Sequence, residues 1–363
     1  EFNTGDNFGC AYFQMNQRKG VRWSASKAFL RPIQHRPNLT VMTNTHVQKL
    51  ALEANEHGPR ATGVWITKGG DAPSLVTATR EVILAAGAVA SPQILQLSGI
   101  GEPALMQQLG TAPVIDLPGV GQNLQDHLQI RTIYKVSNTT TLNPRVNSLV
   151  GKAMMGLEYL LFKTGPLTMP PSQLGAFAKS DEAQPTPNME WHVQPLSLDQ
   201  FGSPLHPFNA ITPSVCNLRP ASRGAITAQS LDPLMAPKIN LNYLSNPEDE
   251  AVALAGLRMT RRIMKAKALA RFLPEEWKPG PERQSDTELL DAARDLGTTI
   301  FHPVGTCKMG ADPAAVVDDR LMVHGCKGLR VIDASIMPLI TSGNTNAPTV
   351  MIAEKGAQFI IED

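Results

Sequence analysis

A histidine near the C-terminal end of the sequence is the residue type best suited to acid–base chemistry at neutral pH. His302 opens the segment 302–310 (HPVGTCKMG). A neutral imidazole can take the proton of a hydroxyl group, because its ordinary pKa of about 6.5 lies near neutral pH. A histidine considered alone is more often a buried core residue with both ring nitrogens hydrogen-bonded. The surrounding segment has to decide between these roles.

Asparagines that follow this segment could hold a substrate oxygen without titrating. Asn344 and Asn346 precede Pro348, and a side-chain amide both donates and accepts hydrogen bonds. The same residues could cap a helix that we predict over residues 348–361, since Asn is favoured at helix N-termini and Pro in the first turn. The two roles are compatible, and the sequence leaves both open.

Two short apolar runs predict the strands that must position these side chains. Residues 81–87 (EVILAAG) show no alternation of polar and apolar residues, which is typical of a strand buried on both faces of a parallel sheet. Small residues and a predicted helix at 93–97 follow, and this order lets a ligand approach the backbone and the positive helix end. Residues 329–333 (LRVID) form a second run of this kind.

The other elements divide the chain into two similar ends and a different middle. We predict a fold of the α/β (α+β) class, with a discontinuous domain over 1–127 and 301–363 and a second domain inserted over 128–300. The predicted elements are a helix at 24–30, antiparallel strands at 39–43, 45–52, 61–67 and 74–79, further strands at 189–193, 211–218 and 225–229, and a helix at 248–272 with a basic, solvated side.

Composition excludes several classes of protein. The 363 residues carry 33 Lys and Arg against 32 Asp and Glu, so the net charge of +1 gives no sign of a nucleic-acid partner. Four scattered cysteines, with no C-x-x-C pair, predict neither a disulfide framework nor a metal site. Free thiols and the lack of a signal peptide favour the cytoplasm, and peripheral association with the inner membrane is a second possibility.

Five segments together resemble the glucose–methanol–choline (GMC) flavin oxidoreductases. The match is specific, because the segments occur in the family's order and spacing at both ends of the chain. The chain looks like the C-terminal two-thirds of such an enzyme and is nearest to the choline, polyethylene glycol and aliphatic alcohol dehydrogenases. The five segments are residues 87–101, 121–127, 302–310, 329–338 and 343–354.

The resemblance implies part of a Rossmann-like domain that holds FAD, and a reaction that oxidises a primary alcohol to an aldehyde by hydride transfer to flavin N5. His302 matches the family's general base and Asn346 its second catalytic residue, while Cys307 falls at a variable position of the motif. Electrons would pass to a quinone or another non-oxygen acceptor. The positions that match cofactor-contacting residues are Val47, Ala86, Gly87, Asp333, Ala334, Asn346, Pro348 and Thr349.

Some alternatives stay open at this stage. Asp333 could instead cap a loop, and His127 is expected to be a structural hydrogen-bonding residue. The family's N-terminal G-x-G-x-x-G unit is missing from the sequence, so a separate chain could carry it, the chain could be a cleavage product, or an isolated fragment could lack FAD binding and activity. A flavin-dependent lyase or an oxidase of the same family is a further alternative.

Overall fold

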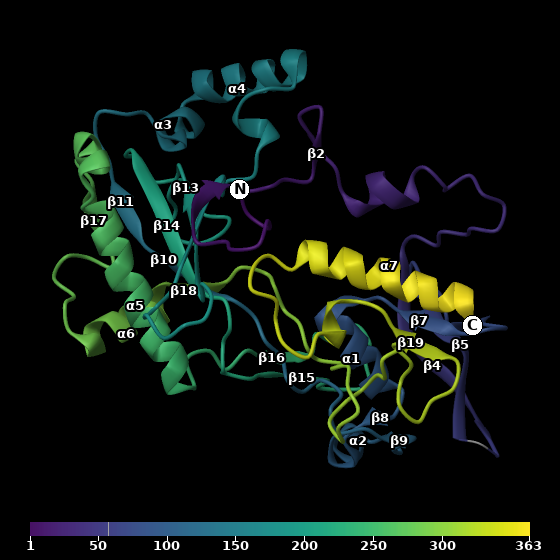
Figure 1. Ribbon diagram of the computed structural model, residues 1–363. Coiled ribbons are helices and arrows are strands. Elements are labelled where there is room, and N and C mark those ends of the chain that lie inside the picture. The colour runs from purple at the N-terminus through teal and green to yellow at the C-terminus, as the bar shows by residue number, and fades with distance from the viewer. Residues whose placement is uncertain (57) are drawn as a thin grey trace. The chain divides into compact units, whose positions relative to one another are not determined.

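Figure 1 shows the computed structural model, which describes residues 1–56 and 58–363. These residues form two compact units. Unit 1 comprises residues 1–41, 128–218 and 247–299, and unit 2 comprises residues 42–127, 219–246 and 300–363.

The unit boundaries after residues 127 and 299 lie at or next to the predicted domain boundaries. Two segments belong to a different unit from the one predicted. Residues 1–41 join unit 1 because Gly9–Tyr12 pair antiparallel with Leu174–Ala178. Residues 219–246 join unit 2, where the side chain of Gln96 accepts a hydrogen bond from the backbone N–H of Ala228 at 2.8 Å. Long-range pairing of this kind leaves no local signal in the sequence.

Unit 2 contains the predicted meander and the predicted parallel pair. The strands β4, β5 and β6 are antiparallel, and β7 pairs parallel with β19. Its elements are the strands β4 (Thr45–Asn55), β5 (Gly58–Lys68), β6 (Ser74–Thr77), β7 (Val82–Leu84), β8 (Ile100–Gly101), β9 (Ile115–Asp116), β15 (Ala225–Thr227), β16 (Lys238–Asn240) and β19 (Leu329–Val331), and the helices α1 (Gly87–Leu97), α2 (Pro103–Leu109), η4 (Ala334–Ile336) and α7 (Asn346–Glu362).

One apolar core holds unit 2 together. Leu329 and Val331 of β19 are fully buried, and so are Leu95 of α1 and Ile100. The expectation that β7 is buried on both faces is wrong, because Ile83 is 42% exposed. The strand β7 is apolar because it belongs to a parallel pair, in which β19 lies along one of its edges.

Helix α1 begins at Gly87, six residues before the predicted start, and runs through Pro92. Proline inside a helix removes one hydrogen bond to the carbonyl four residues earlier, which here belongs to Ala88. That carbonyl is nevertheless satisfied, because the hydroxyl of Thr306 donates to it at 2.7 Å. A residue from the His302 segment thus allows the helix to continue through its proline.

Unit 1 is built on an eight-stranded antiparallel sheet with the central order β1-β12-β13-β14-β10-β18. Its elements are the strands β1 (Gly9–Tyr12), β2 (Gln17–Arg18), β3 (Val21–Arg22), β10 (Leu128–Arg131), β11 (Ile133–Lys135), β12 (Leu174–Ala178), β13 (Met189–Gln194), β14 (Ala210–Asn217), β17 (Glu275–Lys278) and β18 (Gly297–Thr299), and the helices η1 (Ser26–Leu30), α3 (Leu142–Asn147), α4 (Leu149–Phe162), η2 (Pro166–Thr168), α5 (Pro247–Met264), η3 (Lys267–Phe272) and α6 (Asp286–Leu296).

Helix α5 covers one face of this sheet. The indole N–H of Trp191 on β13 donates to the hydroxyl of Thr260 on α5 at 2.8 Å, and both side chains are buried. Gly256 of α5 allows close packing, since a Cβ there would lie 3.0 Å from a methyl group of Val215. The opposite face of β13 is therefore the one that carries Glu190 and His192.

Three other expectations about secondary structure need correction. The long helix ends at Met264 rather than residue 272, because Ala266 adopts an extended backbone before η3. Its basic side is only partly solvated, since Arg261 forms a partly buried ion pair with Glu276 at 2.8 Å. Residues 39–43 form no strand, and Leu39 instead closes a turn with Arg36. Helix α4 was not predicted.

Replacing Thr306 tests the support of α1. The variant Thr306→Val keeps the shape but leaves the buried Ala88 carbonyl unsatisfied, so we expect it to lower the free energy of unfolding by about 1–3 kcal/mol. Thr306→Ser keeps the donor and should lose less. Urea unfolding followed by circular dichroism measures both values, and equal losses in the two variants would contradict this account.

Candidate active site

The backbone around His302 is held by antiparallel pairing with residues 123–127, within unit 2. Gln125 and Val304 exchange two backbone hydrogen bonds, of 2.9 and 3.1 Å. The carboxylate of Asp126 accepts a hydrogen bond from the His302 backbone N–H at 2.9 Å and another from the hydroxyl of Tyr243. The position of the histidine is therefore fixed by its own main chain.

The residue before the histidine has an unusual backbone conformation. Phe301 has a φ of +65° and is 65% exposed. This left-handed conformation is unfavourable for a bulky residue, and strain of this kind is often found at functional sites. It turns the chain so that Phe301 faces solvent, whereas the ring of His302 is 9% exposed.

Both ring nitrogens of His302 have polar neighbours. Nδ1 lies 3.0 Å from Nδ1 of the fully buried His127, and Nε2 lies 3.4 Å from the amide nitrogen of Asn344. An amide N–H can only donate, so Nε2 of His302 accepts. A neutral imidazole that accepts at Nε2 carries its proton on Nδ1, which then donates to His127. This tautomer puts the single lone pair of Nε2 on the side of the Asn344 amide, and a general base would use that lone pair once the amide donates to another acceptor.

The structure brings a different asparagine to His302 than the one chosen from the sequence. Asn346 is the first residue of α7, and its side chain is exposed. Asn344 lies in the loop before it and points its amide at His302. Neither asparagine caps the helix, because Thr345 occupies that position and makes no side-chain capping bond. The sequence could not separate two asparagines so close to Pro348.

Asp333 joins the turns that follow both parallel strands. Its Oδ2 accepts hydrogen bonds from the Gly87 backbone N–H at 2.8 Å and from the Ser91 hydroxyl at 2.6 Å. Its Oδ1 accepts from the backbone N–H of Ser335 at 2.8 Å and from the Ser335 hydroxyl. Asp333 is 5% exposed. The structure therefore gives it the loop-capping role.

The turn after β7 is open on one side. Ala86 is exposed, and Gly87 has a φ of +83° with no atom within 4 Å of the place where a Cβ would stand. The carboxyl ends of parallel strands, followed by a helix N-terminus, are where α/β proteins approach their ligands. A ligand could therefore contact the backbone at this turn.

The other four positions matched to cofactor contacts also lie in unit 2. Val47 lies on β4 opposite Ile66, and Ala334 begins η4 directly after Asp333. Pro348 and Thr349 lie in the first turn of α7. Proline has no backbone N–H, and the backbone N–H of Thr349 donates to the carbonyl of Thr345 at 3.1 Å. Thr349 uses its hydroxyl to bond the carbonyl of Thr345 at 2.8 Å.

Cys307 has no feature of a nucleophile. Its side chain is fully buried. Burial, with a further contribution from the negative charge of Asp333, raises the pKa of its thiol far above the usual range. The thiolate, which is the reactive form, is therefore suppressed.

Unit 1 contains a set of buried polar groups that the sequence did not reveal. His192, Ser214 and Arg131 are aligned across three neighbouring strands of its sheet, and Glu190 lies two residues before His192. We call these four residues the polar row. They are buried, and burial lowers the pKa of the Arg131 guanidinium. In the described part of the chain, the polar-row atoms without a hydrogen-bond partner are Arg131 Nε and Nη1, both carboxylate oxygens of Glu190, His192 Nε2 and Ser214 Oγ.

Burying polar groups without hydrogen-bond partners, as in the polar row, costs free energy. His192 Nε2 lies 3.2 Å from a Glu190 oxygen but outside hydrogen-bond geometry. The polar row offers donors at one end and acceptors at the other, so it can bind a molecule with several hydrogen-bonding groups. In the sequence, only the alternation of side chains along β13 could have indicated that Glu190 and His192 share one face of the sheet.

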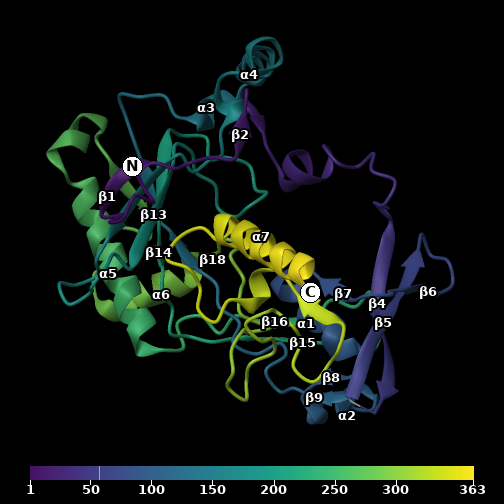
Figure 2. The ribbon, with the colours of Figure 1, turned by 45° about the vertical axis from the view of Figure 1, so that its right-hand side comes forward.

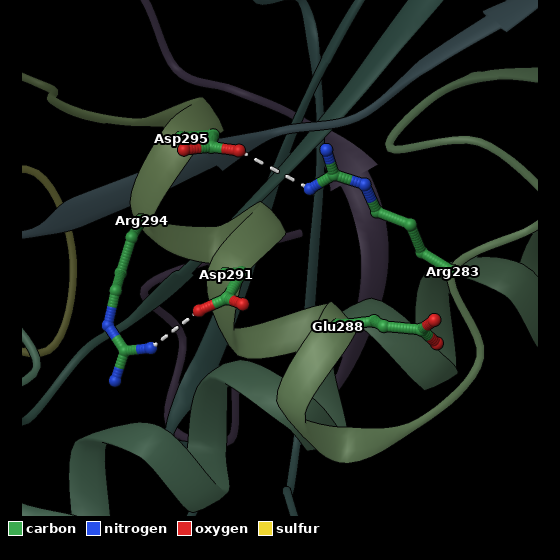
Figure 3. Close-up of a pocket in the computed structure, with 5 residues that line it drawn as sticks. All are labelled: Arg283, Glu288, Asp291, Arg294 and Asp295. Carbon is green, nitrogen blue, oxygen red and sulfur yellow. Dashed lines mark hydrogen bonds and ion pairs between the residues drawn. The ribbon is translucent and has the colours of Figure 1, made fainter.

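A hollow beside helix α6 in unit 1 has different chemistry from the polar row (Figure 3). It encloses about 430 Å³ and is lined only by charged side chains. Arg283 pairs with Asp295 at 3.3 Å and Arg294 with Asp291 at 3.0 Å, so its charges are largely matched. None of the predicted site residues lies there.

Neither a metal cluster nor a membrane span occurs in residues 1–56 and 58–363. These residues contain no group of three or more His, Cys, Asp or Glu side chains placed to hold a metal ion. Their helices are also too short or too polar to cross a bilayer.

Comparison with known proteins places both ends of the chain in one family. Residues 1–129 match the N-terminal part and residues 220–353 the C-terminal part of the GMC oxidoreductase family. An alcohol dehydrogenase [acceptor] of Pseudomonas putida is 41% identical over 99% of this chain and 65% of its own length. An oxygen-dependent choline dehydrogenase of Klebsiella pneumoniae is 41% identical over 94% of this chain and 61% of its own length. The chain thus spans less than two thirds of these relatives.

Solved structures agree in fold. Pyridoxine 4-oxidase from Mesorbium loti superposes with a TM-score of 0.86 at 28% identity, over 99% of this chain and 66% of that one. A formate oxidase superposes with a TM-score of 0.90 at 26% identity, over 98% of this chain and 66% of that one. A related structure of the Aspergillus oryzae formate oxidase concerns modification of its FAD.

Proposed function

The chain belongs to the GMC oxidoreductase family, and we propose that it carries the catalytic base and the substrate-contacting residues of an FAD-dependent alcohol dehydrogenase. The observation that carries this proposal is the environment of His302. An Nδ1–H that donates to His127 and an Nε2 that faces an amide suit a base that accepts a hydroxyl proton.

The residues of unit 2 fit FAD at the turns after β7 and β19. The open side of Gly87 leaves room for a cofactor beside the backbone, while Asp333 holds that turn in place. The first turn of α7, with Pro348 and Thr349, directs the positive end of a 17-residue helix outward, which favours negative charge nearby. When bound, FAD accepts the hydride from the substrate carbon.

The remaining chemistry belongs to side chains of this protein. His302 Nε2 takes the hydroxyl proton of the alcohol, and His127 keeps the opposite nitrogen protonated. The Asn344 amide, which lies beside Nε2, donates a hydrogen bond to the alcohol oxygen and orients it. In this proposal Asn346 contributes as part of the first turn of α7 rather than through its own side chain. A direct contact of its side chain with the cofactor is the less favoured alternative.

The name of the Pseudomonas putida relative supports an alcohol substrate. We propose a primary alcohol, which is oxidised to an aldehyde.

The electron acceptor is part of the proposal too. The name of the Pseudomonas putida relative supports an acceptor other than oxygen, such as a quinone, whereas the Klebsiella pneumoniae relative is named as oxygen-dependent. Both acceptors belong in the assay. We propose the cytoplasm as the location of the reaction.

Removing the base tests the proposal directly. After FAD is added and excess is removed, an absorption spectrum should show retained flavin, which an alcohol should bleach. His302→Ala should slow this bleaching by about 10²-fold or more. His324→Ala, in a histidine that bonds the Gly310 carbonyl, is the matched control and should leave the rate unchanged. Unslowed bleaching in His302→Ala would refute the role of the base, and a chain that keeps no flavin would be the inactive fragment.

His127 should act as a positioning residue. His127→Leu removes the acceptor for Nδ1 of His302, and we expect flavin reduction to slow by about 10–100-fold, the usual effect of losing such a partner. Loss of this acceptor also disfavours protonated His302, so the acid limb of the pH–rate profile should move to lower pH. His127→Asn, which restores an acceptor, should recover part of the rate. A purely structural role predicts an unmoved pH profile in both variants.

A further inference from the structure

Helix α4 turns its apolar side to solvent. Surface helices of globular proteins normally bury their apolar stripe against the core, and in α4 only Met155 is buried. The opposite side is apolar over all four turns of the helix. Its exposed residues are Leu149 (83%), Val150 (73%), Met154 (61%), Leu157 (51%), Leu160 (69%), Leu161 (62%) and Phe162 (70%).

Val150, Met154, Leu157 and Leu161 follow the spacing i, i+4, i+7 and i+11, so they form one continuous stripe along the helix. Exposed apolar surface of this extent marks an interaction site. Leu167, in the following turn η2, is also 54% exposed.

A strongly basic segment packs against the end of this helix. Residues 17–36 contain six Lys or Arg and no Asp or Glu. They contact α4 closely, since a Cβ on Gly20 would lie 2.0 Å from the Lys163 carbonyl oxygen. The Gln17 side chain also donates to the carbonyl of Thr168 at 2.7 Å. Both segments belong to unit 1, and β2 lies near α4 in both views (Figures 1 and 2).

The positive charge of the chain is concentrated in the two segments that meet at the end of α4. Residues 142–168 contribute Arg145, Lys152 and Lys163 against Glu158, which is +2, and residues 17–36 contribute +6. Their sum, +8, leaves −7 for the rest of a chain whose net charge is +1. The even overall composition therefore conceals a basic, apolar surface. We call residues 142–168, which include α4, together with residues 17–36 the α4 surface.

We propose that the α4 surface binds anionic lipid membranes, with α4 lying in the headgroup region. The helix has 14 residues, whereas a span needs about 20, so it can lie on a bilayer but not cross it. Interfacial helices bury an apolar face while basic groups contact anionic headgroups. Arg18, Lys19 and Arg22 are exposed and available for such contacts.

Charge argues against a second copy of the chain as the occupant. A symmetric dimer formed through α4 would place the same surface of each copy against the other. Two segments that carry +8 each would then repel. An anionic bilayer satisfies both the apolar stripe and the charge.

Vesicle sedimentation of the purified chain tests this proposal. Binding should be strong to phosphatidylcholine vesicles with 30% phosphatidylglycerol, weak to pure phosphatidylcholine, and reduced by 0.5 M NaCl, because the Debye length falls. Leu157→Gln/Leu161→Gln should weaken binding by about tenfold or more. Arg18→Gln/Lys19→Gln should weaken it by about fivefold per charge.

Control variants carry the same changes elsewhere in unit 1. Leu273→Gln replaces another exposed leucine (63%), and Lys265→Gln/Lys267→Gln removes two exposed charges. Neither should change vesicle binding. Equal binding to neutral and anionic vesicles, or no binding to either, would overturn the proposal. A dimer in light scattering that Leu157→Gln/Leu161→Gln dissociates would also overturn it, in favour of a second copy.

Discussion

The buried carboxylate of Asp333 is the interaction on which the candidate active site depends. It ends the strand β19 and accepts hydrogen bonds from the turn that follows β7, so two parallel strands deliver their loops to one point. The His302 segment is attached to the same loops, since the N–H groups of Gly305 and Cys307 donate to the carbonyls of Ala334 and Ser335. A charge buried in this way is stable only because four donors satisfy it.

Around that point, the same residues serve structure and chemistry. Thr306 donates to the Ala88 carbonyl, which Pro92 leaves without a partner in helix α1, and it does so from the segment that also holds His302. Asp126 fixes the His302 backbone, and the neighbouring His127 sets which ring nitrogen carries the proton. The segment 121–127 therefore positions His302 through both its main chain and its side chains.

Unit 1 differs in the origin of its functional features. Its sheet buries polar side chains without partners, and its helix α4 exposes apolar ones. Both reverse the usual distribution of polar and apolar residues, and both cost stability unless a ligand or a surface satisfies them.

The sequence by itself determined the family, the two strands that pair in parallel and the antiparallel strands of the middle segment, because these depend on local patterns and on motifs of fixed spacing. Only the tertiary structure decided that Asn344 rather than Asn346 faces His302, that His127 pairs with it, and that Asp333 caps loops. Residues 127 and 302 are far apart in the chain, so no local pattern encodes their contact. The side to which α4 turns was equally undetermined, because periodicity gives the width of an apolar stripe but not what it faces.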